Sequence, residues 1–361
     1  MLGFVTDSDW AIRLVTWTGQ LVAALVLLLM LQVLLLRTWL IVQNRRERRF
    51  LNVWQPLLLQ SLESVPSEVP RIGRDNSFAF LHLWNYLHES LLDEAKERLN
   101  QTARLAGINR MASQMLKDGS VRERLMAIAT IGQLRDQTDW EELQRIAASH
   151  HSLLSLTAAH AMIRIDARAA ITLLTPLIGS RHDWPAARVA WMLKEAGADV
   201  ISEPLACAAL SAALDHTENK ESAEEATRLI RYLEAAHCES AIPVVRRIIH
   251  ITRDREVIIA CLRVFIDSED LDTVRRFLND PRWQIRVQAA TALGRMGTEE
   301  DEARLIALLA DEEWWVRYRA AQALCSLPSV TLAKARRIQM GQTNLFARDI
   351  LEQAIAEQEC I

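Results

Sequence analysis

Histidine stands beside a carboxylate, a second histidine or a cysteine at only a few places in this sequence. Among these pairs are His88-Glu89, His150-His151 and His237-Cys238. A metal site needs several nitrogen, oxygen or sulfur ligands that converge on one point, and none of the pairs has a complementary set elsewhere in the chain. The sequence also lacks the phosphate-binding G-x-x-x-x-G-K loop, the G-x-S-x-G nucleophile turn and the H-E-x-x-H zinc motif. We therefore expect no catalytic activity and no bound metal or cofactor.

The cysteines point the same way. There are five of them, an odd number, and no two have C-x-x-C spacing. A disulfide framework or a structural zinc site would need paired, closely spaced cysteines. We expect reduced and mostly buried thiols in a cytosolic environment.

A second candidate for chemistry is a periodic series of cations. Arg246, Arg275 and Arg304 recur every 29 residues, and Lys334 follows 30 residues later. Such a stripe suits an acidic or phosphorylated segment of a partner, or lipid headgroups. The alternative is that each cation pairs with an acidic residue at the start of a neighbouring helix. Both interpretations stay open at this point.

Five tryptophans stand beside acidic residues near expected helix starts, namely Trp140, Trp184, Trp283, Trp314 and Trp315. Trp283 and Trp314 hold equivalent repeat positions, so we expect them to stack on each other. Trp315 has no counterpart in register, so we expect it to anchor an interface, a common role of tryptophan.

These residues must be positioned by the elements around them, and the first element is a long apolar stretch. Residues 14–36 contain no charge over 23 positions, which is enough for a helix to cross a bilayer. Trp17 and Trp39 stand near its ends, as interfacial aromatics do. Five cations follow it, namely Arg37, Arg45, Arg46, Arg48 and Arg49. The positive-inside rule predicts an N-terminus outside and a cytoplasmic body, in a single-pass protein of a bacterial inner membrane. A cleaved signal peptide would need a basic start, a shorter apolar core and a small-residue cleavage site.

The body repeats itself. The segment from Asp280 returns 31 residues later at Asp311, with Asp, Trp, Arg, Ala-Ala and Ala-Leu in register. Weaker copies begin near residues 118, 152, 183 and 254. A period of about 30 residues with helical patterning is typical of a solenoid of stacked helix pairs.

Within a repeat, the first helix is expected to open at an Asp or Ser cap close to a proline, as at Asp280-Pro281 and at Asp183 with Pro185. Small residues at its centre, such as Ala289-Ala290 and Ala320-Ala321, allow close helix packing. The second helix is expected over 299–310, and acidic residues at its start favour the helix dipole.

This pattern resembles the HEAT-repeat family, and in particular the short bacterial repeats of the PBS-lyase-like class. The resemblance rests on Asp280, Ile285-Arg286, Ala289-Ala290, Ala292-Leu293-Gly294, Asp311, Val316-Arg317, Ala320-Ala321 and Ala323-Leu324. It implies ladders in which the Asp and the Val-Arg pair join neighbouring repeats, and second helices that line a concave face. It specifies an architecture and not an activity.

The predicted fold is therefore all-α, a transmembrane helix followed by an α-solenoid of about seven helix pairs between atypical capping helices. The expected divisions are an outer tail (1–13), a transmembrane helix with its interfacial end (14–42), a basic juxtamembrane helix and loop (43–77), an atypical N-terminal cap (78–117), the repeats (118–340) and a C-terminal capping helix (341–361).

With 42 basic and 46 acidic residues, the chain has a net charge of −4, which argues against a nucleic-acid binder. We expect a membrane-tethered scaffold or adaptor that binds a partner protein at the cytoplasmic face of the inner membrane. The alternatives are an accessory subunit of an envelope polysaccharide or secretion machine, a HEAT-like enzyme of the lyase type, and a nucleic-acid binder that uses the concave groove.

Overall fold

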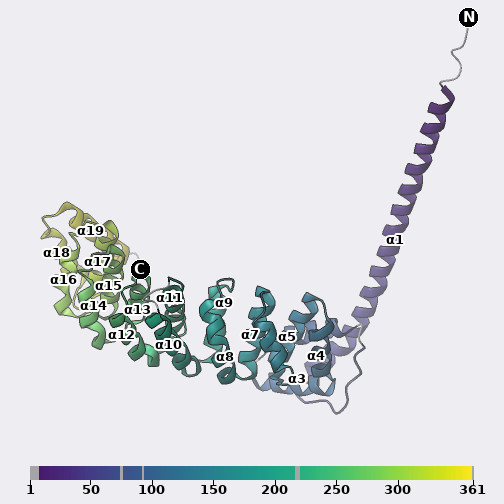
Figure 1. Ribbon diagram of the computed structural model, residues 1–361, viewed down its shortest axis with the longest axis horizontal. Helices are drawn as coiled ribbons and strands as arrows, with labels where there is room; N and C mark the ends of the chain where they lie inside the picture. Colours follow the sequence, from purple (N-terminus) through teal and green to yellow (C-terminus); the bar gives the residue numbers. More distant parts are fainter. Residues whose placement is uncertain (1–7, 74–75, 92, 216–219, 360–361) are drawn as a thin grey trace, which may run out of the picture. The chain divides into compact units, whose positions relative to one another are not determined.

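A computed structural model describes residues 8–73, 76–91, 93–215 and 220–359 (Figure 1). All regular elements in these ranges are helices, as the sequence predicts. The chain divides into two compact units, Met1–Leu134 and Arg135–Ile361.

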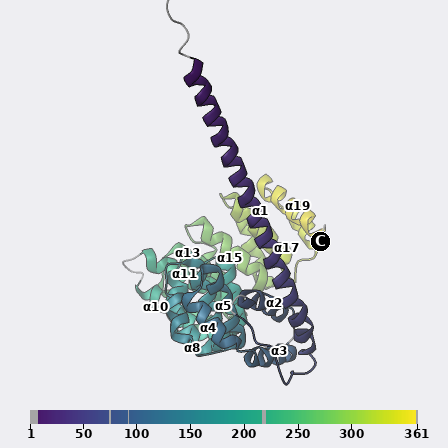
Figure 2. The ribbon, with the colours of Figure 1, turned by 90° about the vertical axis from the view of Figure 1, so that its right-hand side faces the viewer.

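The first unit is built on one very long helix. Its helices are α1 (Ser8–Gln60), α2 (Ser77–Glu89), α3 (Asp93–Leu105), α4 (Ile108–Asp118) and α5 (Val121–Leu134). The apolar part of α1, Leu14–Thr38, has a mean hydropathy of 2.5, and none of its described side chains is buried. Figures 1 and 2 show it projecting away from α2 and α3. Its length and composition would let it cross a membrane.

The same helix ends inside a small core. Trp54 and Leu58 of α1 are fully buried against Phe80 and Trp84 of α2, and the rings of Trp54 and Phe80 meet edge to face at 4.7 Å. Burial of each large side chain contributes about 1.5–3 kcal/mol. Because α1 is continuous from Ser8 to Gln60, no loop separates its apolar half from this core.

The second unit consists of short helices that alternate in two kinds. They are α6 (Trp140–Ala147), α7 (Ser152–Ile165), α8 (Ala167–Ser180), α9 (Ala186–Ala196), α10 (Ala198–Asp215), α11 (Lys220–Ala235), α12 (Ile242–Ile251), α13 (Arg255–Val264), α14 (Leu271–Phe277), α15 (Trp283–Met296), α16 (Glu302–Leu308), α17 (Trp314–Ser326), α18 (Leu332–Met340) and α19 (Leu345–Glu359). Short 3-10 turns η2 (Glu239–Ala241), η3 (Ser268–Asp270) and η4 (Glu299–Asp301) precede α12, α14 and α16. Within the described part of the second unit, α7 to α18 form six helix pairs in chain order, a solenoid of helix pairs as the sequence predicts.

The first helices of successive pairs pack side by side from α11 through α13, α15 and α17 to α19. The small residues predicted at their centres are fully buried there, as Ala289, Ala290, Ala320 and Ala321 show. Gly294 of α15 also lies at this contact, where an added Cβ atom would stand 2.8 Å from the Cα atom of Ala323. The absence of large side chains thus sets how closely α15 and α17 approach.

The predicted helix caps are only partly correct. Asp254 caps α13 by accepting hydrogen bonds from the backbone N–H groups of Glu256 and Val257. Asp280, in contrast, lies three residues before α15, and its carboxylate accepts hydrogen bonds from Arg282. Asp183 pairs with Arg181 in the same way, so the sequence prediction of an Asp cap with an adjacent proline is wrong at both places. A nearby arginine competes for the carboxylate and displaces the start of the helix.

Candidate functional site

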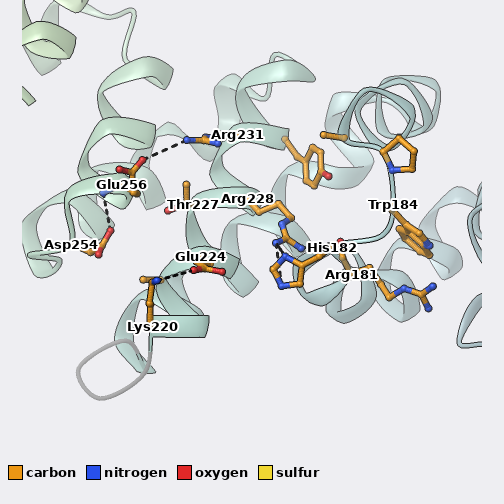
Figure 3. Close-up of a pocket in the computed structure, with 14 residues that line it drawn as sticks. Arg181, His182, Trp184, Lys220, Glu224, Thr227, Arg228, Arg231, Asp254 and Glu256 are labelled. Atoms are coloured by element: carbon orange, nitrogen blue, oxygen red, sulfur yellow. Dashed lines mark hydrogen bonds and ion pairs between the residues drawn. The ribbon is translucent and has the colours of Figure 1, made fainter. Parts of the chain in front are cut away.

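A polar groove of the second unit lies over one face of α11. It has a volume of about 630 Å³, and we call it the α11 groove (Figure 3). Its floor is formed by residues spaced three or four apart on α11: Lys220, Ala223, Glu224, Thr227, Arg228 and Arg231. The segment before α9 forms one wall and the start of α13 forms the other.

Cations gather on the side of the groove that faces the segment before α9. Arg228 donates hydrogen bonds from Nη1 to the carbonyl oxygens of Gly179 (3.1 Å) and Arg181 (2.9 Å), and its Nη2 meets the ring of His182. Arg181 holds Asp183 with two hydrogen bonds of 2.6 Å, and this hydrogen bonding lowers the pKa of Asp183 to about 2. In the part of the chain that the structure describes, Arg228 has no carboxylate partner.

Carboxylates dominate the opposite wall. Glu256, at the start of α13, accepts a hydrogen bond from Arg255 and lies 3.8 Å from Nη2 of Arg231. Asp254 stands beside it as the cap of α13. Figure 3 shows Arg228 and His182 together on one side of the groove and Glu256 and Asp254 on the other. The groove therefore presents opposite charges at its two walls, an arrangement suited to recognition of a charged ligand.

Two buried polar atoms belong to residues that line this groove. Thr227 and Trp184 are both more than nine-tenths buried, and within the described residues neither the Thr227 hydroxyl nor the Trp184 ring N–H has a hydrogen-bond partner. Beneath them, burial raises the pKa of Tyr232. Thr227, Trp184 and Tyr232 thus form a buried, uncharged part of the groove.

The arginine and aspartate residues of the repeat motif form a ladder between repeats. Arg286 of α15 donates to both carboxylate oxygens of Asp311, at 2.9 and 2.7 Å, and this hydrogen bonding raises the pKa of Arg286. Arg317 of α17 donates to the backbone carbonyl oxygen of Asp311 at 2.8 Å. Asp311 thereby holds an arginine from its own repeat and one from the repeat before, as the family resemblance implies.

Comparison with known families agrees with this ladder. The sequence pattern of the family described as HEAT repeats matches residues 252–325, which span α13 to α17. Residues 252–325 of this chain are HEAT repeats. The chain is also similar to an engineered protein of known crystal structure, with 15% sequence identity, a TM-score of 0.34, and coverage of 83% of this chain and 88% of that one. No curated protein matches it significantly.

The second helices of the HEAT repeats carry the periodic cations. Arg246 pairs with Asp270, and Arg275 pairs with Asp301 through two hydrogen bonds of 2.7 and 3.0 Å. Both aspartates are almost fully buried at the start of the next second helix, and both arginines have a raised pKa because of these hydrogen bonds.

The remaining two cations are also paired. Arg304 reaches Asp301 at 3.2 Å, and Nζ of Lys334 donates to Glu302 at 2.6 Å. All four cations therefore make ion pairs within the HEAT array. Binding of a partner by the same four cations stays a prediction.

The tryptophans of the HEAT repeats do not share one role. Trp314 stacks on Tyr318, with ring centroids 5.0 Å apart, and meets Trp315 edge to face. The expected stacking of Trp283 on Trp314 is absent from the ring contacts of the described residues. Trp314 and Trp315 are 42% and 50% exposed, whereas Trp184 is buried. Trp315 as an interface anchor stays a prediction, now within an exposed aromatic cluster.

Residues expected to anchor the chain lie along α1. Trp17 is 72% exposed, and Arg45, Arg48 and Arg49 are exposed as well. The side chains of Trp39 and Arg46 lie outside the described residues.

The α11 groove has no clear signal in the sequence. Glu224 precedes Arg228 by four residues, the spacing of a favourable helical ion pair, so Arg228 looks neutralised when read as sequence. The fold instead directs Arg228 toward the carbonyl oxygens that end α8, while Glu224 pairs with Lys220. Only the packing of α11 against the segment before α9 distinguishes the two outcomes.

Proposed function

We propose that this HEAT-repeat protein is a scaffold that holds a partner protein at the cytoplasmic face of a bacterial inner membrane. The observation that carries the proposal is the continuity of α1, whose exposed apolar stretch Leu14–Thr38 runs without a break into the buried residues Trp54 and Leu58. A solenoid offers an extended surface in place of a catalytic pocket, which suits binding of a protein.

The geometry of α1 sets where such a scaffold would stand. Phe50 is the first residue of α1 that packs against the core of the first unit. It lies 12 residues after Thr38, a distance of about 18 Å along a helix. The exposed Arg45, Arg48 and Arg49 fall within this interval, where cations favour the cytoplasmic side and contact anionic lipid. The first unit would therefore be held close to the membrane by a helical stalk.

The aromatic cluster of Trp314, Trp315 and Tyr318 and the cations Arg246, Arg275, Arg304 and Lys334 are proposed contact surfaces for the partner. The cluster is the stronger of the two, because aromatic side chains anchor interfaces and the cations already have acidic partners.

Cell fractionation followed by crosslinking tests this proposal. The full chain is expected in the membrane fraction and is expected to retain one stoichiometric partner after detergent extraction. Replacing Leu27 and Leu29 by arginine is expected to release the chain from the membrane, because each arginine at the centre of a spanning helix costs about 2.5–3.5 kcal/mol. A wild-type chain found in the soluble fraction would overturn the tether, and a chain that captures no partner would overturn the scaffold.

A further inference from the structure

The α11 groove is shaped for a linear ligand. Its floor runs from Lys220 to Arg231 along α11, which is about 17 Å at 1.5 Å per residue. An extended peptide advances about 3.3 Å per residue, so the floor matches a segment of about five residues. A groove of this length over a single helix face fits a peptide better than a compact small molecule.

Arg228 determines which chemical group one end of the ligand must carry. Three acceptors hold its guanidinium, namely two carbonyl oxygens and the ring of His182. These contacts fix the position of the group but supply no negative charge. A guanidinium has five N–H donors, and in the described residues Nε of Arg228 makes no hydrogen bond. An arginine that is fixed and still has free donors is prepared to bind a carboxylate.

The arginines that lie between repeats take two kinds of partner. Arg246, Arg275 and Arg286 each donate to a carboxylate that belongs to a neighbouring repeat. Arg228 occupies a comparable place between repeats, yet it bonds to backbone carbonyl oxygens of the repeat before it. Arg295 bonds in the same way to the carbonyl oxygens of Leu262, Arg263 and Phe265. Arg228 is therefore one of several arginines that bond to backbone and not to a carboxylate, and it lines the α11 groove.

The acidic residues of the opposite wall determine which chemical group the other end of the ligand must carry. Asp254 and Glu256 stand together at the start of α13, and Arg231 approaches Glu256 only to 3.8 Å, beyond hydrogen-bonding distance. Glu256 accepts a hydrogen bond of 2.9 Å from its neighbour Arg255, but its side chain is 46% exposed, so it remains accessible to a further cation.

We infer that the α11 groove binds an extended segment of the partner protein that places an acidic side chain against Arg228 and a basic side chain against Glu256. This inference rests on the proposed scaffold function and identifies the class of partner segment that the scaffold recognises. The selection comes from charge complementarity between the two walls and the segment.

Site-specific photocrosslinking in intact cells tests the inference on the full chain. The crosslinker p-benzoylphenylalanine replaces Ala186, which is exposed on the wall of the groove, and in a second strain it replaces Trp315. The expected adduct at position 186 maps by mass spectrometry to a partner segment that contains both an acidic and a basic residue. Arg228→Glu is expected to abolish this adduct, whereas Arg168→Glu, an equal charge change at an exposed position of α8, is expected to preserve it.

A synthetic peptide with the sequence of the crosslinked segment gives the affinity. Arg228→Glu is expected to raise its Kd by about tenfold or more, since a charge pair is replaced by a repulsion. Glu256→Lys acts on the exposed opposite wall, where loss of folding is not expected, and should also weaken binding. Unchanged binding by both variants overturns the inference.

The outcomes separate the inference from the scaffold proposal. A partner captured at position 315 but not at 186 overturns the groove and leaves the scaffold standing. A captured segment without an acidic residue also overturns the inference. Capture of no protein at either position overturns the scaffold itself.

Discussion

Arg286 and Asp311 join two successive repeats through a bidentate ion pair, with hydrogen bonds of 2.9 and 2.7 Å between groups that are mostly buried. The same guanidinium also donates to the carbonyl oxygen of Asp280, which precedes its own helix. One side chain thus fixes both the start of α15 and the distance to the next repeat. In a solenoid, where each repeat contacts only its neighbours, such a contact carries much of the coupling.

Breaking this pair is expected to lower the thermal stability of the array. Asp311→Asn leaves the guanidinium of Arg286 without a charged partner, and the loss of hydrogen bonds to a charged group costs about 1.5–3 kcal/mol. Arg286→Lys should be nearly as harmful, because an ammonium group cannot reproduce the two parallel hydrogen bonds. The midpoint of thermal unfolding, followed by circular dichroism of the full chain in detergent, measures the effect. An unchanged midpoint in both variants would show that the ladder is energetically neutral.

The sequence predicts the frame of this molecule better than its details. The length of the apolar stretch predicts the exposed half of α1. The repeated Ala-Ala pairs predict the buried helix centres at Ala289 and Ala320. These features depend on local composition and period. The predicted cap at Asp280 is wrong, because the carboxylate of Asp280 accepts a hydrogen bond from Arg282 and does not cap the helix. The α11 groove could not be predicted for a related reason, since Arg228 bonds to Gly179, which lies 49 residues earlier in the chain.

A pH-dependent contribution is expected from Glu195. Burial raises its pKa, but hydrogen bonds with His160 and Arg164, at 2.7 and 2.8 Å, outweigh burial and bring the pKa from 4.5 down to about 2. A carboxylate with a depressed folded pKa stabilises the fold above its unfolded pKa, and this contribution is lost as the pH falls toward the folded pKa. The stabilisation should therefore be complete at pH 7 and should disappear between about pH 4.5 and pH 2.

Comparison with Glu195→Gln isolates this term from the other carboxylates. The difference in unfolding midpoint between wild type and variant should be largest at neutral pH and should shrink on acidification across that range. Glu141→Gln, at an exposed position of α6, is the charge-matched control. A difference that stays constant from pH 7 to pH 2 would contradict the assigned role of Glu195.

Gly294 is expected to tolerate no side chain. A Cβ atom at this position would lie 2.8 Å from the Cα atom and 2.9 Å from the Cβ atom of Ala323, and backbone cannot move aside as a flexible side chain can. Gly294→Ala therefore should push α15 and α17 apart, at a cost of roughly 1–3 kcal/mol from overpacking. The control is Gly341→Ala, where the nearest atom would be 3.5 Å away. A lowered unfolding midpoint for the first variant and an unchanged one for the second is the expected result, and equal midpoints would contradict the close approach.

Trp315 should affect binding without affecting stability. It is half exposed and touches Trp314 and Tyr318 only at ring edges. Trp315→Ala is expected to reduce capture of the partner severalfold, in line with truncation of an aromatic interface anchor, while the unfolding midpoint stays near that of the wild type. Capture at the wild-type level would remove this cluster from the proposed contact surfaces.

Arg304 separates the structural role of the periodic cations from a role in binding. Arg275 is largely buried and makes two hydrogen bonds to the buried Asp301, whereas Arg304 is about half exposed and makes one longer bond to the same carboxylate. Because an exposed ion pair contributes only about 0–1 kcal/mol, Arg304→Glu should leave the fold intact. Arg275→Glu should unfold the local repeats, since it places a second negative charge beside Asp301. Partner capture by the folded Arg304→Glu variant then tests whether the cations bind the partner. Capture equal to wild type would mean that the cations contribute only to the stability of the array.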